Sequence, residues 1–521
     1  MDPISESNGG PISRRTVLGL AAATSFNAVA QGAPDAIAAV SQANDLVMMD
    51  ATSLTSVIHT RRVSCVEVMA AYLDHIEKLN PKVNAIVALQ DRGELLAQAR
   101  ERDAQLARGE SMGPLHGFPH AVKDLQAVKG IRTTMGSPIL RDFVPTADSL
   151  MVARLRKAGA IFIGKTNVPE FGLGSHTFNS VYGITRNPYN LSRSAGGSSG
   201  GAAVSLALRM VPVADGTDYG GSLRNPAGWN AVFGFRTSIG RVPTDARDSW
   251  LPSMGVVGPL ARNVTDLAMV LSVQAGFDAQ APLSLDSETS IFQSRLDRDL
   301  KGKRIAWGAD FKGHTPCEPS VLEVCAKAVR TFESLGCVVE EATPNFDVDA
   351  VWQAFVRLRG WQQGVSLLGY YNNPLQRSLL KPEAVFEVET GLRQSAYDIT
   401  AASVVRTQWY EAVRRFFDRY DYLVLPTAQV FPFNVEEHWP REIRGTTMQT
   451  YHEWMKGSVL ITMAGCPALA VPAGFSDQGL PMGIQLIGPN RSELDCLRLA
   501  FAYESAMDPA SRRLPSLLTQ V

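Results

Sequence analysis

Two serine sites flanked by glycines lie within one short stretch, residues 193–224, and they constrain this chain more than any other feature. The first reads G-G-S-S-G-G at 196–201, and the second reads G-G-S at 220–222. Glycine permits positive φ and a close approach of the backbone to a ligand, which a nucleophile ringed by backbone N–H donors needs. The apolar run at 202–208 distinguishes the stretch from a Gly/Ser linker. Taken alone, either site is equally well explained by a tight turn before a buried helix.

A lysine closes a short apolar stretch upstream of both serine sites. Turn residues at 113–117 lead into 118–122, which reads as a strand, and Lys123 follows directly. Burial at the end of a strand would lower the pKa of this lysine by desolvation and let its neutral amine act as a base. Since side chains alternate along a strand, Asp124 does not have to pair with Lys123. A surface lysine that ends the strand is the alternative.

Helical and strand patterns alternate along the rest of the chain. Apolar residues at three- and four-residue spacing predict a helix over 63–73, where Ser64 and Glu67 can form a capping box. Further helices are expected at 92–108, 149–159 and 263–276, and strands at 160–164, 304–307, 338–339, 422–426 and 468–472. This alternation indicates a sheet that helices cover on both faces.

The first 40 residues have the pattern of an export signal. A polar stretch at 1–13 precedes Arg14-Arg15, a weakly apolar segment and Ala28-Val29-Ala30. These parts in this order are typical of a twin-arginine signal peptide, and a disordered tail is the alternative. We therefore predict a signal peptide and tail at 1–40 and a protein that works in the periplasm or is secreted, with a cytoplasmic location as the alternative.

Composition and motifs exclude several classes of protein. The formal net charge of the 521 residues is −1, which gives no electrostatic case for binding nucleic acid or an anionic membrane. No later apolar run is long enough to span a bilayer, so we expect no membrane insertion after signal removal. The six cysteines form no C-x-x-C or Cys/His cluster, and we expect no metal and no cofactor. Buried free thiols are expected, with a Cys325–Cys337 disulfide as the alternative.

Three motifs together resemble the signature of the amidase signature family of serine hydrolases. They are V-K-D around Lys123, G-G-S-S-G-G around Ser198 and G-T-D-Y-G-G-S-L-R around Ser222, with the two serines 24 positions apart. The resemblance covers about residues 50–514, and motifs this long in this order are highly specific. It implies an α/β fold, an α/β/α sandwich with a large central mixed β-sheet, for an amidase catalytic domain at 45–521.

The resemblance also implies roles for the residues of both loops. Ser222 is the expected nucleophile, Ser198 the bridging serine that follows a cis peptide, and Lys123 the terminal base. A serine hydroxyl is a poor nucleophile until a base takes its proton, which agrees with this set. The expected oxyanion donors are the backbone N–H groups of Tyr219, Gly220, Gly221 and Ser222. Structural support is expected from Ser199 and from a loop-fixing pair of Asp218 and Arg224, for which a surface ion pair is the alternative.

Several positions depart from the common pattern of the family. Trp229-Asn230 stands where many members have small residues and a cysteine, Arg236 where lysine is common, and Tyr219 where the residue is usually smaller or aliphatic. None belongs to the triad, but each can reshape the pocket. The aromatic-rich stretch 430–454 is either a lid that selects the acyl or amine group or packing under a long loop.

Two rival arrangements of the nucleophile remain to be tested. Residues 197–201 fit G-x-S-x-G, the nucleophile elbow of α/β-hydrolases, with Ser199 at the centre, but a turn precedes them where that elbow needs a hydrophobic strand. His120 or His176 could also activate Ser222, although Lys123 already supplies a base.

The predicted function is an amidase that hydrolyses the C–N bond of a linear carboxylic amide to a carboxylate and ammonia or an amine, through an acyl-enzyme on Ser222. The expected partner is a small-molecule amide substrate, and a homodimer is left open. The alternatives are the A subunit of a tRNA-dependent amidotransferase, or a non-catalytic binding protein on the same fold.

Overall fold

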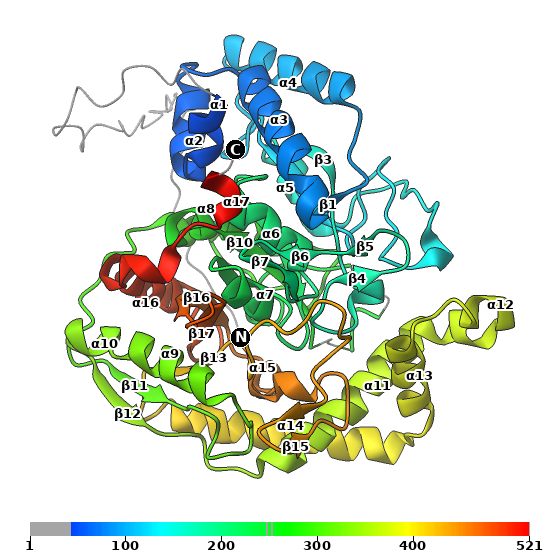
Figure 1. Cartoon of the computed structure of the whole chain (residues 1–521), viewed down its shortest axis with the longest axis vertical. Helices are drawn as coiled ribbons and strands as arrows, with labels where there is room; N and C mark the ends of the chain where they lie inside the picture. The colour runs from blue at the N-terminus through cyan, green and yellow to red at the C-terminus, as the bar shows by residue number, and fades with distance from the viewer. Residues whose placement is uncertain (1–42, 246–247, 252–253, 520–521) are drawn as a thin grey trace, which may run out of the picture. The chain divides into compact units, whose positions relative to one another are not determined.

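A central sheet of eight strands organises the part of the chain that the structure, a computed structural model, describes: residues 43–245, 248–251 and 254–519. The predicted signal peptide at 1–40 lies outside these residues. In spatial order the strands are β12 (Val338–Glu341), β11 (Arg304–Trp307), β13 (Tyr422–Pro426), β17 (Pro481–Ile487), β16 (Ala468–Phe475), β9 (Phe233–Arg236), β10 (Val256–Ala261) and β8 (Ala214–Asp218) (Figure 1). β11 runs parallel to β12 and β13, and the other neighbouring pairs are antiparallel, so the sheet is mixed as predicted.

Smaller sheets hold the remaining strands. The order β1 (Ile86–Val87), β3 (Ile161–Thr166), β2 (Pro119–Lys123) makes a three-stranded sheet, in which β2 and β3 are parallel. Two-stranded ladders join β4 (Phe178–Asn179) to β5 (Gly183–Ile184), β6 (Arg186–Asn187) to β7 (Asn190–Ser194), and β14 (Glu442–Ile443) to β15 (Thr446–Thr447). Lys123 therefore ends a fully buried strand, as predicted, but that strand belongs to the small sheet and lies beside β8.

Seventeen α-helices are assigned among the described residues. They are α1 (Ala43–Met48), α2 (Ala51–His59), α3 (Cys65–Val83), α4 (Arg92–Ala107), α5 (Leu150–Lys157), α6 (Gly200–Ala207), α7 (Arg224–Trp229), α8 (Val264–Gln274), α9 (Pro319–Val329), α10 (Thr331–Ser334), α11 (Val348–Asn372), α12 (Pro374–Arg377), α13 (Pro382–Leu392), α14 (Ala396–Phe416), α15 (Lys456–Ala464), α16 (Glu493–Ala506) and α17 (Ser516–Thr519). The predicted capping box at the start of α3 is confirmed, because Ser64 accepts from the Glu67 N–H and Glu67 accepts from the Ser64 N–H.

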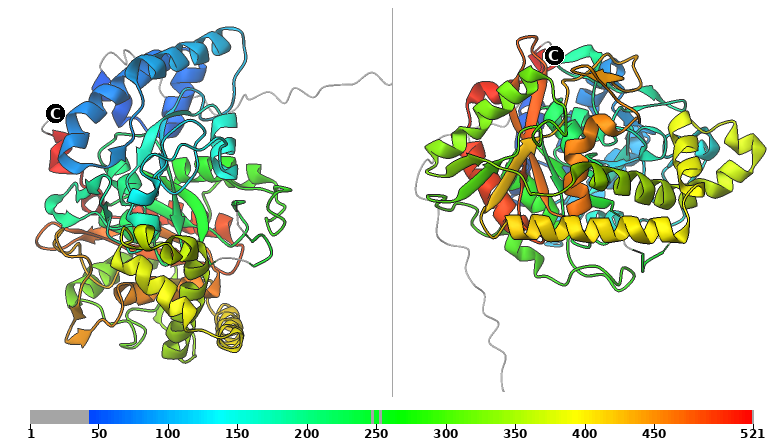
Figure 2. Two further views of the ribbon diagram at one scale, coloured as in Figure 1. Left: turned by 90° about the vertical axis from the view of Figure 1, so that its right-hand side faces the viewer. Right: turned by 90° about the horizontal axis from the view of Figure 1, so that it is seen from below.

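Helices cover both faces of the central sheet, which confirms the predicted sandwich. α9, α10 and α16 lie on one side and α11, α14 and α15 on the other (Figure 2). On the second side, side chains such as Leu358, Trp409 and Leu460 pack on Leu423 and Leu425 of β13 in one buried cluster. Strands β13 and β17 are buried along their whole length, as expected for strands that helices enclose from both sides.

α11 and α13 pack against each other and extend away from the central sheet, at the right of Figure 1. Their backbones approach closely where Gly391 meets Gly360. A Cβ at Gly391 would lie 2.4 Å from the Gly360 carbonyl oxygen, so this crossing requires glycine. α11 matters for function because its other side reaches the cavity described below.

All six cysteines are buried free thiols, as predicted, and Cys325 and Cys337 do not form a disulfide. No helix among the described residues is long and apolar enough to cross a membrane.

Candidate active site

Lys123 lies at the centre of a buried group of hydroxyls. Its side chain is fully buried, and Nζ lies 2.8 Å from each of Ser198 Oγ, Ser199 Oγ and Thr217 Oγ1. Thr217 is on β8, so the end of β2, the first serine loop and β8 meet at this amine. A neutral amine has two N–H donors and one lone pair, so it can donate to two of these hydroxyls and accept from the third. Thr217 was not singled out from the sequence, although it stands directly before Asp218.

Burial lowers the pKa of Lys123 to about 7, although Asp215 and Asp218 act in the opposite direction. Both carboxylates also interact with other groups, which limits how far they raise the pKa of Lys123. Asp215 lies 2.9 Å from His120 Nε2 and accepts from the backbone N–H of Lys123, and Asp218 pairs with arginines. Asp124 accepts from Thr134, as expected for a carboxylate that does not pair with Lys123. The surface-lysine alternative is therefore wrong.

The first serine loop connects β7 to α6 and places its two serines differently. The Gly197–Ser198 peptide bond is cis, and Ser198 lines a large cavity. Ser199 is fully buried and is the N-cap residue of α6. Its hydroxyl accepts from Lys123 and lies 3.4 Å from the Thr217 carbonyl oxygen. Its N–H donates to the Ser222 carbonyl at 3.3 Å, which ties the two serine loops together.

Ser222 lies on the second loop, between β8 and α7, and is partly exposed to the same cavity as Ser198. Within the described residues, no hydrogen bond of the Ser222 hydroxyl is found. Gly221 has φ +131°, and a Cβ there would lie 3.1 Å from Ser458 Cβ, so this position needs glycine. The Gly221 N–H donates to Asp218 at 3.0 Å, which removes it from the expected oxyanion donors because its hydrogen is already engaged. The N–H groups of Tyr219, Gly220 and Ser222 have no acceptor among the described residues.

A buried ion network holds the second loop. Arg224 Nε and Nη2 donate to the two carboxylate oxygens of Asp218 at 3.0 and 2.9 Å, and Arg236 Nη1 lies 3.1 Å from Asp218 Oδ1. All three side chains are fully buried, so the surface-pair alternative is wrong. Burial raises the pKa of Asp218, but Arg224 and Arg236 outweigh it and hold this pKa well below its ordinary value. Arg236, a departure from the family pattern, is thus part of the support for the loop.

The rival nucleophile arrangements find no support in this geometry. Ser199 does not line the cavity, and the strand before it, β7, belongs to a two-stranded ladder with a partly exposed, polar sequence. His120 contacts Asp215, while His176 contacts Val435 O at 2.9 Å and Ser194 Oγ at 2.7 Å. Neither histidine lines the cavity that Ser222 faces.

The cavity beside Ser198 and Ser222 has a volume of about 780 Å³. Much of its wall was missed by sequence reasoning, because it comes from distant segments: Leu125 and Gln126, 171–173, 244–245, 248–251, 255–257, and 359, 361–363, 365 and 366 of α11. Tyr219 also lines it, and its ring lies 4.7 Å from the Arg359 guanidinium carbon. No motif in the sequence marks these residues as part of one cavity.

Four aromatic side chains of the stretch 430–454 are buried in the protein, and the stretch does not form a lid over the cavity. Trp454 is fully buried and stacks on Trp229, with ring centroids 5.4 Å apart. Phe433 meets both rings edge-on at 5.5 Å. No residue of 430–454 lines the cavity beside Ser222, so the packing alternative is correct and the selecting-lid hypothesis is wrong.

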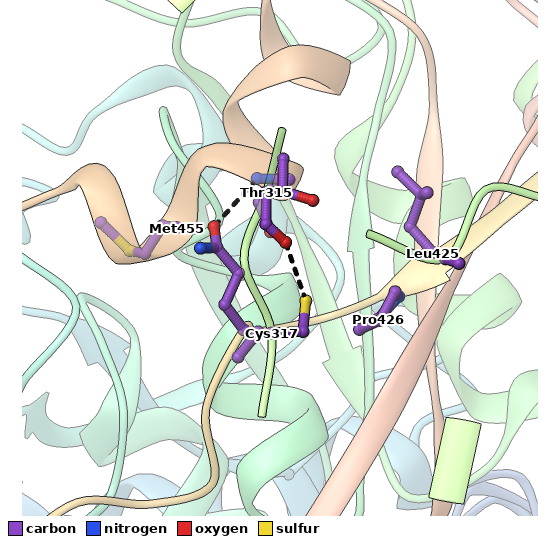
Figure 3. Close-up of a pocket in the computed structure, with 10 residues that line it drawn as sticks. Thr315, Cys317, Leu425, Pro426 and Met455 are labelled. Atoms are coloured by element: carbon purple, nitrogen blue, oxygen red, sulfur yellow. Dashed lines mark hydrogen bonds between the residues drawn. The ribbon is translucent and has the colours of Figure 1, made fainter. Parts of the chain in front are cut away.

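A second cavity, behind Ser458, is far smaller. Its volume is about 10 Å³, and it is lined by residues that include Thr315, Cys317, Leu425, Pro426 and Met455 (Figure 3). The Cys317 thiol donates to the Thr315 carbonyl at 3.2 Å, and burial raises its pKa well above the ordinary value. The cavity has room for at most one water molecule. The raised pKa keeps the Cys317 thiol protonated, so it is not a reactive thiolate. In the described ranges, no group of three or more His, Cys, Asp or Glu side chains is placed to hold a metal.

Comparisons with known proteins agree on one family. The family model Amidase matches residues 67–497. An acylamidase of Rhodococcus erythropolis is 33% identical over 473 residues, covering 90% of this chain and 98% of that protein. The A subunit of the glutamyl-tRNA(Gln) amidotransferase of Moorella thermoacetica is 34% identical over 490 residues, covering 90% of this chain and 99% of that protein. The crystal structure of a bacterial aryl acylamidase of the amidase signature family has a TM-score of 0.84 and 30% identity, covering 90% of this chain and 98% of that one.

Proposed function

The chain belongs to the amidase signature family, and from that premise we propose that it hydrolyses the C–N bond of a small carboxylic amide through a Ser-Ser-Lys triad. One observation carries the proposal. The buried Nζ of Lys123, with its pKa lowered to about 7, lies 2.8 Å from Ser198 Oγ, and Ser198 shares a cavity with Ser222. About half of the Lys123 side chains are then neutral near pH 7, so a base is available at ordinary pH.

Acylation begins when Lys123 takes the proton of Ser198 and Ser198 takes the proton of Ser222. The Ser222 oxygen forms a bond to the amide carbon, and the carbonyl oxygen becomes an oxyanion. The N–H groups of Tyr219, Gly220 and Ser222 are the donors available to it, and one such donor is typically worth about 2.7–4 kcal/mol. The C–N bond then breaks as Ser198 Oγ gives its proton to the departing nitrogen, and Lys123 returns a proton to Ser198.

Deacylation repeats these steps with water. Water gives one proton through Ser198 to Lys123, and its oxygen bonds to the ester carbon. The bond from that carbon to the Ser222 oxygen then breaks as the proton returns to Ser222, and the carboxylic acid leaves and ionises to the carboxylate. Ser199 and Thr217 hold the amine of Lys123 throughout, because both contact Nζ at the same distance as Ser198. Ser199 is therefore assigned as a positioning residue.

The A subunit of a tRNA-dependent amidotransferase is the second candidate, favoured by the 34% identity to the protein of that kind from Moorella thermoacetica. The export-like pattern at 14–30 supports an independent hydrolase outside the cytoplasm instead. A binding protein without catalysis is disfavoured because Lys123, Ser198 and Ser222 are all retained.

The test is hydrolysis of a panel of primary and N-substituted amides, and of free glutamine, by the isolated chain. Ser222→Ala is the inactive control, and Ser205→Ala, which changes a buried serine of α6 away from the cavity, is the matched control. We expect product from one or more non-glutamine amides with wild type and Ser205→Ala only. Turnover of glutamine alone, dependent on added partner proteins, would identify the amidotransferase component.

A further inference from the structure

The wall beside Ser198 is where the nitrogen half of a substrate must lie. A group that protonates a leaving nitrogen has to come within about 2.6–3.2 Å of it. In the proposed function, on which this inference rests, that group is Ser198 Oγ. The substituent on the nitrogen must therefore extend along the part of the cavity that adjoins this oxygen.

Gly172 and Leu125 occupy that part. A Cβ at Gly172 would lie 3.4 Å from Ser198 Oγ and 2.6 Å from Leu125 Cδ1, so these three residues meet at one point. Gly172 also has φ +71°, a conformation that L side chains rarely adopt. Any larger residue at 172 would fill the space next to the hydroxyl that protonates the nitrogen.

Anchors on several elements fix this wall. The Glu170 carboxylate accepts from the Ser137 hydroxyl at 2.6 Å and from the Lys381 N–H at 2.9 Å. Lys381 Nζ donates to the Leu173 carbonyl at 2.6 Å, and the Phe171 ring stacks on Tyr370 of α11 with centroids 5.7 Å apart. Phe171 itself has φ +51°, which a non-glycine residue keeps only when its surroundings hold it there. The wall is thus a preformed surface.

We propose that Leu125, Phe171 and Gly172 form the leaving-amine subsite, and that it takes an uncharged, apolar substituent. Segments 125–126 and 171–173 contribute Leu125, Gln126, Phe171, Gly172 and Leu173 to the cavity. This part of the cavity wall therefore carries no ionised side chain. A charged amine substituent would lose its hydration there without gaining a partner. The substrate class is therefore secondary amides of apolar amines, such as anilides.

The test compares selectivity between substrates that share one acid. The kcat/KM values for an N-phenyl and an N-naphthyl amide, each divided by that for the unsubstituted amide, are measured for wild type, Gly172→Ala and Leu125→Ala. Val404→Ala, which changes an exposed residue of α14 away from the cavity, is the matched control. A ratio cancels any general loss of activity from altered folding, and Leu125→Ala keeps the test valid if Gly172→Ala does not fold.

Wild type is expected to prefer the N-phenyl amide. Gly172→Ala should lower the ratio by about tenfold or more, the usual effect of misfitting a small apolar group, while Leu125→Ala raises the relative rate for an N-naphthyl amide. Val404→Ala should leave the ratio within about twofold of wild type. A preference for the unsubstituted amide, or ratios that move equally in all three variants, would overturn the subsite. If wild type hydrolyses no amide at all, the proposed function itself fails, which separates the two failures.

Discussion

Replacing Lys123 with methionine should change how the stability of the protein depends on pH. Burial lowers the pKa of Lys123 to about 7, whereas a lysine in the unfolded chain keeps a pKa near 10.4. Between these values the unfolded state binds more protons than the folded state, so the contribution of Lys123 to the free energy of unfolding rises with pH. Below about pH 7 both states are protonated, and this contribution becomes constant at its least favourable value.

The magnitude follows from the size of the pKa shift. Where the unfolded state binds one proton more than the folded state, the free energy of unfolding rises by about 1.4 kcal/mol per pH unit. At pH 7 Lys123 in the folded state is about half protonated. From pH 7 to pH 9, wild type should therefore gain about 2 kcal/mol relative to Lys123→Met. Methionine also removes the hydrogen bonds of Lys123 to Ser198, Ser199 and Thr217. Their loss lowers the free energy of unfolding of the variant by the same amount at each pH, so it does not produce this pH dependence.

Equilibrium urea unfolding of both proteins at pH 6, 7, 8 and 9 measures the effect. Lys82→Met is the matched control, because it replaces an exposed lysine of α3 and so separates the loss of a lysine from the loss of a buried one. The free energy of unfolding of wild type minus that of Lys123→Met should rise from pH 7 to pH 9. If this difference stays constant within about 0.5 kcal/mol, the conclusion that Lys123 becomes neutral in the folded protein is refuted.

Three further predictions concern activity, the buried network and export. Because the neutral form of Lys123 is the proposed base, kcat/KM should rise about tenfold per pH unit below pH 7 and level off above it; a profile flat from pH 5 to 8 would contradict that role. Asp218→Asn should cost about 3–5 kcal/mol in urea unfolding, since it leaves Arg224 and Arg236 buried without a carboxylate, while Lys303→Met at an exposed pair should cost less than about 1 kcal/mol; equal losses would contradict the account. Changing Arg14 and Arg15 to lysine should retain the protein in the cytoplasm on cell fractionation, and unchanged export would exclude a twin-arginine signal.

Local signals in the sequence were sufficient for many elements of the fold. The capping box at Ser64 and the 3.6-residue periodicity after it predict the start of α3, and the apolar run before Lys123 predicts β2. These features depend on residues close together in the chain. The assignment of β2 to a separate small sheet depends on pairing with β3, some 40 residues later, and no local pattern indicates it.

The candidate site was also predicted only in part from the sequence. The motifs around Lys123, Ser198 and Ser222 indicated residues that the fold brings to one place. The motifs did not reveal that Ser199 and Thr217 contact the lysine as closely as Ser198, because which hydroxyl faces the amine depends on the turn geometry of the loop. The engagement of the Gly221 N–H by Asp218 and the cavity wall from α11 likewise depend on tertiary packing. The role of Gly172 could not be predicted from the sequence, because it depends on the proximity of Leu125 and Ser198 in the fold.

The most direct test of the central claim is intact-protein mass spectrometry after treatment with a sulfonyl or phosphonyl serine probe. Wild type, Ser222→Ala, Ser199→Ala and Lys123→Ala are compared, and the adduct is located by peptide mapping. The account predicts a single adduct on Ser222, absent from Ser222→Ala, formed more slowly in Lys123→Ala and still formed in Ser199→Ala. An adduct on Ser199, or no adduct on a wild-type protein that hydrolyses amides, would contradict it.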